Sequence, residues 1–197
     1  SVAVGEARAG HKPPTGRRWK SRYHGAGIAP EEDLALPEEK PYLEYVDGVV
    51  LQKPMVNSAH LRVVGELCFR FGLYREQHGG AFGPEGRVKL GELPNFRLPD
   101  VSYWVAGADA SDDAVPTLAV EVRSPGQTLG ELREKCHFFR RNGIAAAWLI
   151  DPDSRTVEVF EGAQDGEQLG IGAVLAASCL PGFELPLSTL FAVLASD

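Results

Sequence analysis

Apolar residues recur at helical spacing in two long segments of the chain, and the first of these covers residues 58–78. Its apolar positions lie three and four residues apart, so they form one stripe along a helix and predict that this stripe faces a core. The stripe consists of Leu61, Val64, Cys68 and Phe71. Asn57 or Ser58 can cap the start of the helix, and Gly79-Gly80 ends it.

The second long helix is predicted over residues 129–142. Thr128 and Glu131 form the T-x-x-E pattern of a capping box, and Asn142-Gly143 ends the helix. Two shorter helices are predicted at 31–40, ending near Pro41, and at 187–194. The apolar stripe of the second long helix is Leu129, Leu132, Cys136 and Phe139.

Extended segments separate these helices. The clearest is a hairpin with β-prone runs at 42–46 and 49–53 on either side of Asp47-Gly48, a dipeptide that suits a type I′ turn because both central residues need positive φ. Strands interrupted by helices predict an α/β fold with a mixed sheet. The further strands are predicted at 81–90, 98–105, 117–123, 145–151 and 156–161.

Composition agrees with one globular domain over residues 31–197. The 197 residues are 44% apolar and 24% charged, which excludes wholesale disorder, collagen and coiled coil. No apolar run approaches the roughly 20 residues that span a bilayer, and the N-terminus lacks the apolar core of a secretion signal. The three cysteines fit neither a disulfide framework nor a zinc site, so a reduced, cytoplasmic compartment is expected.

Charge is distributed unevenly. Residues 1–30 hold six Lys/Arg and one acid and are rich in Gly and Pro, whereas residues 31–197 hold 14 bases and 26 acids. A flexible basic tail can hold nucleic acid through phosphate contacts. The alternative is a solubilising extension or a wrongly assigned start. The acidic body argues against a passive nucleic-acid binder, but not against an enzyme that gathers carboxylates around cations.

Three charged residues at the ends of neighbouring elements are candidates for chemistry. Asp100 follows Pro99 at the start of a strand, Glu121 lies inside the apolar run LAVEV, and Lys135 lies on the helix that follows. If the two strands pair, both carboxylates converge at one end of the sheet. Such a pair of carboxylates suits Mg²⁺, which typically takes one or two protein carboxylates as ligands. A nearby lysine can orient a water molecule or neutralise a phosphoryl oxygen.

Each of these residues also has a structural interpretation. Glu121 in an edge strand would face solvent, and Asp100 after a proline is often a turn cap. Lys135 borders the apolar stripe of its helix, so its aliphatic part can pack there while its ammonium group reaches water.

The motif residues resemble those of a known family. Pro99-Asp100 followed by Glu121-Val122-Arg123 resembles the signature of the PD-(D/E)XK nuclease superfamily. The longer string LAVEVRSPGQTLGELREKCHFFRRNGIAAAWLIDPDSRTVEVF, with EYVDGVV and RLPDVSYW before it, is similar to the Uma-type putative restriction endonucleases. The similarity spans about residues 31–194.

This resemblance implies a restriction-endonuclease-like core with an N-terminal β-hairpin, and Asp100 and Glu121 as the metal-binding acids. The superfamily lysine normally stands two residues after the glutamate, where this chain has Arg123, a poor base. The resemblance implies that Lys135 replaces it from the next helix. Glu44 is implied as a third carboxylate near the metal, or it is an exposed hairpin charge. His60 lines the cleft, or it is a capping or core histidine.

The function expected is therefore a Mg²⁺- or Mn²⁺-dependent endonuclease acting on DNA, with a homodimer suited to cutting both strands. The alternative is a catalytically inactive nuclease-fold module that binds nucleic acid or a protein partner. A metal-dependent hydrolase of another substrate has no supporting feature. The sequence also contains neither a P-loop nor a G-x-S-x-G motif.

Overall fold

The computed structural model describes residues 23–36, 42–86, 88–90, 95–108 and 114–195. Within these ranges a six-stranded mixed sheet has the order β10-β9-β8-β7-β6-β3. Strands β7 and β8 are parallel and the other neighbours are antiparallel. The strands are β3 (Ala81–Pro84), β6 (Val101–Trp104), β7 (Leu118–Val122), β8 (Ala146–Asp151), β9 (Thr156–Glu161) and β10 (Gln164–Leu169). The predicted α/β fold with a mixed sheet is therefore confirmed.

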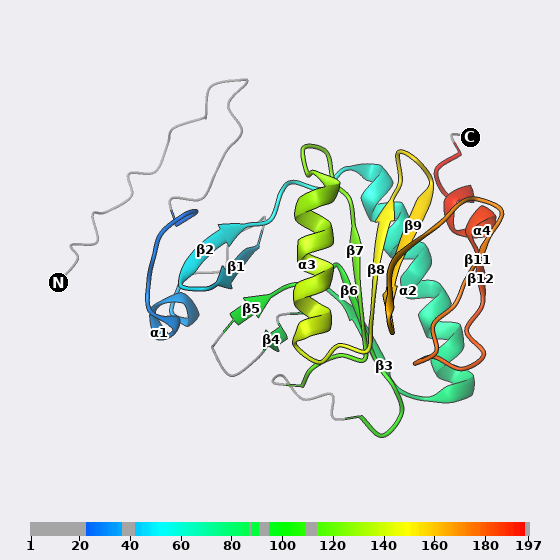
Figure 1. Cartoon of the computed structure of the whole chain (residues 1–197), viewed down its shortest axis with the longest axis horizontal. Coiled ribbons are helices and arrows are strands. Elements are labelled where there is room, and N and C mark those ends of the chain that lie inside the picture. Colours follow the sequence, from blue (N-terminus) through cyan, green and yellow to red (C-terminus); the bar gives the residue numbers. More distant parts are fainter. Residues whose placement is uncertain (1–22, 37–41, 87, 91–94, 109–113, 196–197) are drawn as a thin grey trace.

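Helices α2 (Ser58–His78) and α3 (Leu129–Arg141) cover opposite faces of this sheet, as Figure 1 shows. The larger core lies between α2 and the sheet and contains Phe71, Tyr103 and Trp148, all fully buried. The smaller core lies under α3 and contains Phe139 and Phe160. Strands β7 and β8 contribute to both cores, because alternate side chains of a strand point to opposite faces.

The long helix α2 has the predicted limits, but a different side of it is buried. The Asn57 side chain accepts the His60 N–H as its N-cap, and Gly79 ends the helix at φ 75°. The predicted stripe is wrong by one position, because Leu61 is 58% exposed while Val64 and Cys68 are only partly buried. The buried residues are His60, Val63, Leu67 and Phe71.

Helix α3 agrees closely with its prediction. The Thr128 hydroxyl accepts the Glu131 N–H and the Glu131 carboxylate accepts the Thr128 N–H, which completes the capping box. Its buried residues are Leu132, Lys135, Cys136 and Phe139, so the predicted apolar stripe faces the sheet, with Leu129 partly buried at its start.

A second sheet of four strands has the order β2-β1-β5-β4. The predicted hairpin is confirmed, and both turn residues, Asp47 and Gly48, have positive φ of 48° and 84°. The predicted strand 81–90 is wrong as a single strand, because β3 joins the large sheet and β4 joins the small one. The strands of this sheet are β1 (Leu43–Val46), β2 (Val49–Gln52), β4 (Val88–Leu90) and β5 (Asn95–Arg97).

The remaining elements are short. Helix α1 (Pro30–Leu34) ends with Ala35 as its C-cap, so the predicted helix 31–40 is too long, and residues 37–41 lie outside the described residues. Strands β11 (Val174–Leu175) and β12 (Leu185–Pro186) pair near helix α4 (Leu187–Ala192), which begins where predicted and ends two residues earlier.

Most of the predicted basic tail, residues 1–22, lies outside the described residues, so its flexibility stays a prediction. Tyr23 and Ile28 pack against the hairpin core, and Gly27 forms an isolated bridge with Val49. In the part of the chain that the structure describes, no helix is long and apolar enough to cross a membrane.

Candidate active site

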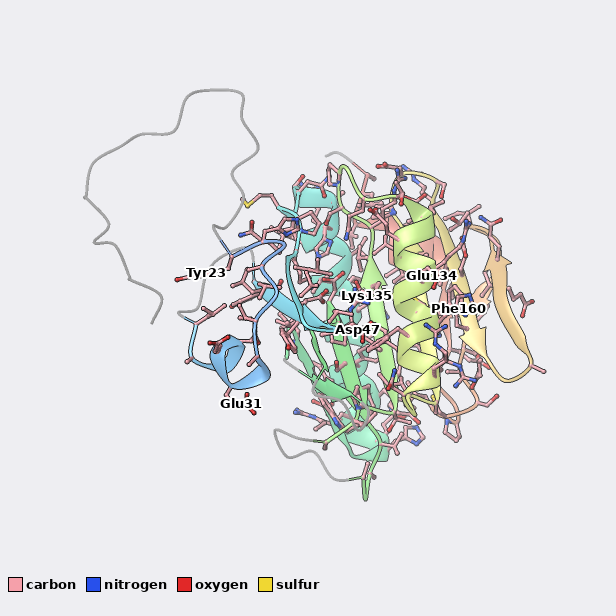
Figure 2. The ribbon with its side chains drawn as sticks, turned by 60° about the vertical axis from the view of Figure 1, so that its left-hand side comes forward. Tyr23, Glu31, Asp47, Glu134, Lys135 and Phe160 are labelled. Atoms are coloured by element: carbon pink, nitrogen blue, oxygen red, sulfur yellow. The ribbon has the colours of Figure 1, made fainter. Side chains whose placement is uncertain are left out.

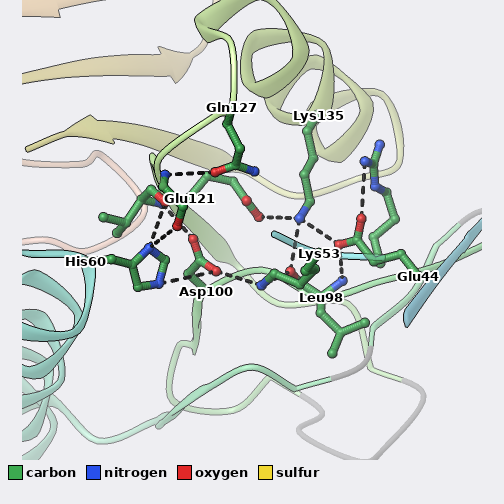
Figure 3. A network of polar contacts seen from close by, with 11 residues as sticks. Glu44, Lys53, His60, Leu98, Asp100, Glu121, Gln127 and Lys135 are labelled. Atoms are coloured by element: carbon green, nitrogen blue, oxygen red, sulfur yellow. Dashed lines mark hydrogen bonds and ion pairs between the residues drawn. The ribbon is translucent and has the colours of Figure 1, made fainter. Parts of the chain in front are cut away.

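Asp100 and Glu121 meet because their strands pair. Strands β6 and β7 are antiparallel with Val101 opposite Val120, and the Asp100 N–H donates to Val120 O at 2.9 Å. The Asp100 side chain accepts the Val122 N–H at 2.7 Å through Oδ2. Figure 3 shows the two carboxylates side by side. The predicted pairing of the two strands is therefore confirmed.

Glu121 is a buried carboxylate with little compensation. It is 1% exposed, which excludes the alternative of an edge-strand residue facing solvent. Its Oε1 lies 2.9 Å from Lys135 Nζ, but the two groups are not aligned for a hydrogen bond. Burial raises the pKa of Glu121 to about 7, because the positive charge of Lys135 offsets the loss of water only in part and the negative charge of Asp100 adds to it.

Lys135 reaches this site from the middle of α3. Its side chain is 6% exposed, and Nζ lies 2.6 Å from Glu44 Oε1 in an ion pair and donates to Leu98 O at 3.1 Å. Figure 2 shows Lys135 on the side of α3 that faces the hairpin. Its ammonium group therefore lies among carboxylates and not in bulk water.

Glu44 comes from the hairpin strand β1 and is also buried, so it is not the exposed hairpin charge of the alternative interpretation. It accepts the Leu98 N–H at 2.9 Å, and its Oε2 lies 3.3 Å from the Arg97 guanidinium. Burial alone would raise its pKa, but the positive charges of Lys135, Arg97 and Lys53 lower the pKa to about 2. Glu44 is a permanent anion that holds Lys135 in place.

Lys53 completes the group, and the sequence interpretation did not include it. It follows β2, and its Nζ donates to Asp100 Oδ1 at 2.6 Å and to Leu98 O at 3.0 Å. Burial would lower the pKa of Lys53, but Asp100, Glu121 and Glu44 raise it. The positive charges of the site have the opposite effect on the pKa of the Asp100 carboxyl group. Burial would raise its pKa, but Lys53, His60 and Lys135 lower it.

His60 lies behind the carboxylates. Its Nδ1 lies 3.0 Å from both Val122 O and Ser124 Oγ, and its Nε2 lies 3.8 Å from Asp100 Oδ1. The ring is 3% exposed and joins the start of α2 to the end of β7. His60 is not among the residues that line the cavity described below, so the expectation that it lines the cleft is wrong, and it is a core histidine beside Asp100.

Arg123 points to another part of the molecule. Its guanidinium donates to both carboxylate oxygens of Asp151 at 3.3 Å and to Gln127 O at 3.2 Å. Of the six residues singled out from the sequence, Glu44, His60, Asp100, Glu121 and Lys135 are therefore brought together, and Arg123 is turned away from them.

A cavity of about 870 Å³ opens onto this network. Part of its lining is the segment 51–57, which runs from the end of β2 to the residue before α2 and includes Lys53. Residues 125–127, α3 residues as far as Lys135, Glu44 and Arg97 also line it. A solute in this cavity would therefore meet the ammonium groups of Lys53 and Lys135.

The residues present fit one divalent cation. No cluster of three or more His, Cys, Asp or Glu that could hold a metal occurs among the described residues. Mg²⁺, however, usually takes one or two protein carboxylates and keeps several waters. Asp100 and Glu121 supply two, and Glu121 Oε1 is buried without a hydrogen bond, which is the kind of oxygen that a cation would satisfy.

Comparisons with known proteins identify the family and the fold of the chain. Residues 30–188 match the model of the Uma2 family, described as putative restriction endonuclease. A crystal structure of a putative nuclease belonging to DUF820 from Anabaena variabilis is similar, with 26% identity and a TM-score of 0.75. The match covers 85% of this chain and 99% of that chain, and it confirms the expected nuclease-like fold. No curated protein matches the chain.

Proposed function

Because the chain belongs to the Uma2 family of putative restriction endonucleases, we propose that it is a magnesium-dependent endonuclease that hydrolyses phosphodiester bonds in DNA. The observation that carries this proposal is the buried group of Asp100, Glu121 and Lys135 at the end of paired strands β6 and β7. In this group Glu121 Oε1 is buried without a hydrogen bond, and burial raises the pKa of Glu121 to about 7, a kind of shift that occurs often at functional sites.

In this proposal Asp100 and Glu121 hold one Mg²⁺ or Mn²⁺. The ion, when bound, would offset the negative charge that develops on the phosphate oxygens during hydrolysis. The Asp100 side chain is held in position to bind the ion because its Oδ2 accepts the Val122 N–H at 2.7 Å. Glu121 is fixed because it lies inside a central strand, paired with Leu149 of β8.

Lys135 supplies the second positive charge. Glu44 and the Leu98 carbonyl hold its ammonium group at 2.6 and 3.1 Å, beside Glu121 and facing the cavity. A prepositioned ammonium group stabilises charge on a phosphoryl oxygen without reorganising during the reaction. Lys135 therefore orients the phosphate and the attacking water in this proposal.

Two further parts of the proposal concern the whole protein. A homodimer would present two sites to the two strands of a duplex, and analytical ultracentrifugation tests it by mass. A reduced, cytoplasmic setting agrees with the three free cysteines, Cys68, Cys136 and Cys179.

Cleavage of supercoiled plasmid DNA tests the proposed activity. We expect nicked and linear products with Mg²⁺ and none with EDTA, and about a 100-fold or larger loss of rate in Asp100→Asn and Glu121→Gln. Asp153→Asn is the matched control, because the Asp153 side chain is 80% exposed. Wild-type rates in both site variants would exclude this site. DNA binding without cleavage under any metal would favour the inactive-module alternative.

A further inference from the structure

Lys53 follows strand β2 directly, and its ammonium group is bound inside the site. Its backbone N–H donates to Tyr42 O across the hairpin at 2.9 Å, which fixes where its side chain begins. That side chain is 8% exposed. The 2.6 Å contact between Nζ and Asp100 Oδ1 therefore joins a buried lysine to one particular oxygen of a buried aspartate.

The two carboxylate oxygens of Asp100 have different environments. Oδ2 accepts the backbone N–H of Val122, and this hydrogen bond connects the end of β7 to the residue before β6. Oδ1 faces Lys53, and His60 Nε2 lies 3.8 Å away from it. Lys53 therefore neutralises the Asp100 oxygen that the backbone does not use, which is also the oxygen available to a metal ion.

The two lysines of the site differ in the number of carboxylates with which they form ion pairs. Lys135 Nζ lies between two carboxylates, Glu44 at 2.6 Å and Glu121 at 2.9 Å, whereas the ion pair of Lys53 is with Asp100. Both ammonium groups donate to the same Leu98 carbonyl, so two positive charges already share one oxygen. A divalent cation at Asp100 would add two more, and the ammonium group paired with fewer carboxylates leaves more easily.

From this geometry we infer that Lys53 competes with the metal ion: its ammonium group occupies Asp100 Oδ1 in the metal-free protein, and a divalent cation binds there only when Lys53 turns away. This inference rests on the metal site of the proposed function. Lys53 lines the cavity, so its flexible side chain has space to enter when it leaves Asp100.

This competition has two consequences. Lys53 keeps Asp100 neutralised when no metal is bound, because a buried carboxylate without a cation would destabilise the fold. It also weakens metal binding, since the cation must displace an ion pair 2.6 Å long. Metal entry then releases a positive charge into the cavity, where a phosphate group would meet it.

Isothermal titration calorimetry of the full chain with MnCl₂ tests this. Lys53→Met keeps the apolar stem and removes the charge, so we expect the Mn²⁺ Kd to fall about tenfold or more. Lys53→Arg keeps the positive charge and should retain about the wild-type Kd. Arg70→Met is the control for overall charge, because Arg70 pairs with Glu66 on the surface of α2, about 15 Å along the helix from His60.

The possible outcomes separate this inference from the proposed function. An unchanged or weaker Mn²⁺ affinity in Lys53→Met, with binding lost in Asp100→Asn, overturns the inference and leaves the metal site standing. Equal binding by wild type, Asp100→Asn and Glu121→Gln overturns the metal site itself, and so does the absence of binding in wild type and Lys53→Met alike. If Lys53→Met does not fold, Lys53→Gln should show the same gain in affinity, and no gain there contradicts the inference.

Discussion

Glu121 and Glu44 are both buried beside Lys135, yet their pKa values move in opposite directions. Glu44 accepts hydrogen bonds from Leu98 and Arg97 and lies 2.6 Å from the Lys135 ammonium group, and these positive charges lower its pKa to about 2. Glu121 Oε1 lies 2.9 Å from the ammonium group without a hydrogen bond, and burial raises the pKa of Glu121 to about 7. Of these two glutamates, Glu44 therefore stays ionised, whereas Glu121 ionises near neutral pH.

This difference predicts a pH dependence of stability in the metal-free protein. Between its usual pKa of 4.5 and about 7, Glu121 binds a proton in the folded chain but not in the unfolded chain. The free energy of unfolding should therefore fall as the pH rises through this window, by about 3 kcal/mol at most. Urea unfolding in EDTA measures the fall, which should be absent in Glu121→Gln. Equal slopes for both proteins would show that Glu121 does not ionise in this window.

Lys135 and Arg123 should differ in their effect on catalysis. Lys135→Met removes the ammonium group between Glu44 and Glu121, so we expect a loss of stability of about 3 kcal/mol and about a 100-fold fall in cleavage rate at saturating DNA. Arg123→Met should keep most of the rate, because Arg123 pairs with Asp151. The assignment of Lys135 fails if Arg123→Met is inactive while the folded Lys135→Met protein keeps nearly full turnover.

At the scale of elements, local signals predicted the hairpin, the limits of α2 and the capping box of α3. These features depend on neighbouring residues, such as Asp47-Gly48, where both residues have positive φ. The inward side of α2 depends on the rest of the fold. Two stripes offset by one residue share Phe71, and packing against the sheet buries the one with Val63 and Leu67.

The meeting of Asp100, Glu121 and Lys135 was predicted from strand order and from the family resemblance, and the structure brings the three together. Their role in metal binding and catalysis stays a prediction. Lys53 could not be found in this way, because its partner Asp100 lies 47 residues further along the chain and a lysine after a strand and before a proline has no local signature. Only the folding of the hairpin over Leu98 brings it to the site.

The buried side of α2 can be tested with two leucines of the same helix. Leu67 is fully buried, whereas Leu61 is 58% exposed. Leu67→Ala should lower the free energy of unfolding by about 2–5 kcal/mol, and Leu61→Ala should change it by less than about 0.5 kcal/mol. Urea denaturation of both variants measures this. If Leu61→Ala lowered the free energy of unfolding more than Leu67→Ala, the apolar stripe predicted from the sequence, and not the one with Leu67, would face the core.

At the scale of the whole molecule, the uneven charge predicts that the basic N-terminal tail contributes to DNA binding and not to the stability of the folded domain. Removal of residues 1–22 deletes six Lys/Arg and one Glu but keeps Tyr23 and Ile28 on the hairpin core. We expect the melting temperature to stay the same. DNA affinity should fall, and the dependence of log K on log salt should become less steep. Fluorescence anisotropy in EDTA measures both quantities. Identical slopes would show that the tail is only a solvated extension.

The central claim is that Asp100 and Glu121 hold a divalent cation. A crystal of the full chain soaked in MnCl₂ tests it most directly, because anomalous scattering locates manganese. The account predicts an anomalous peak within about 2.0–2.3 Å of a carboxylate oxygen of each residue, with Lys53 Nζ moved away from Asp100 Oδ1. A soaked crystal with no peak between the two carboxylates, and with the ion pair of Lys53 and Asp100 intact at 2.6 Å, would contradict it.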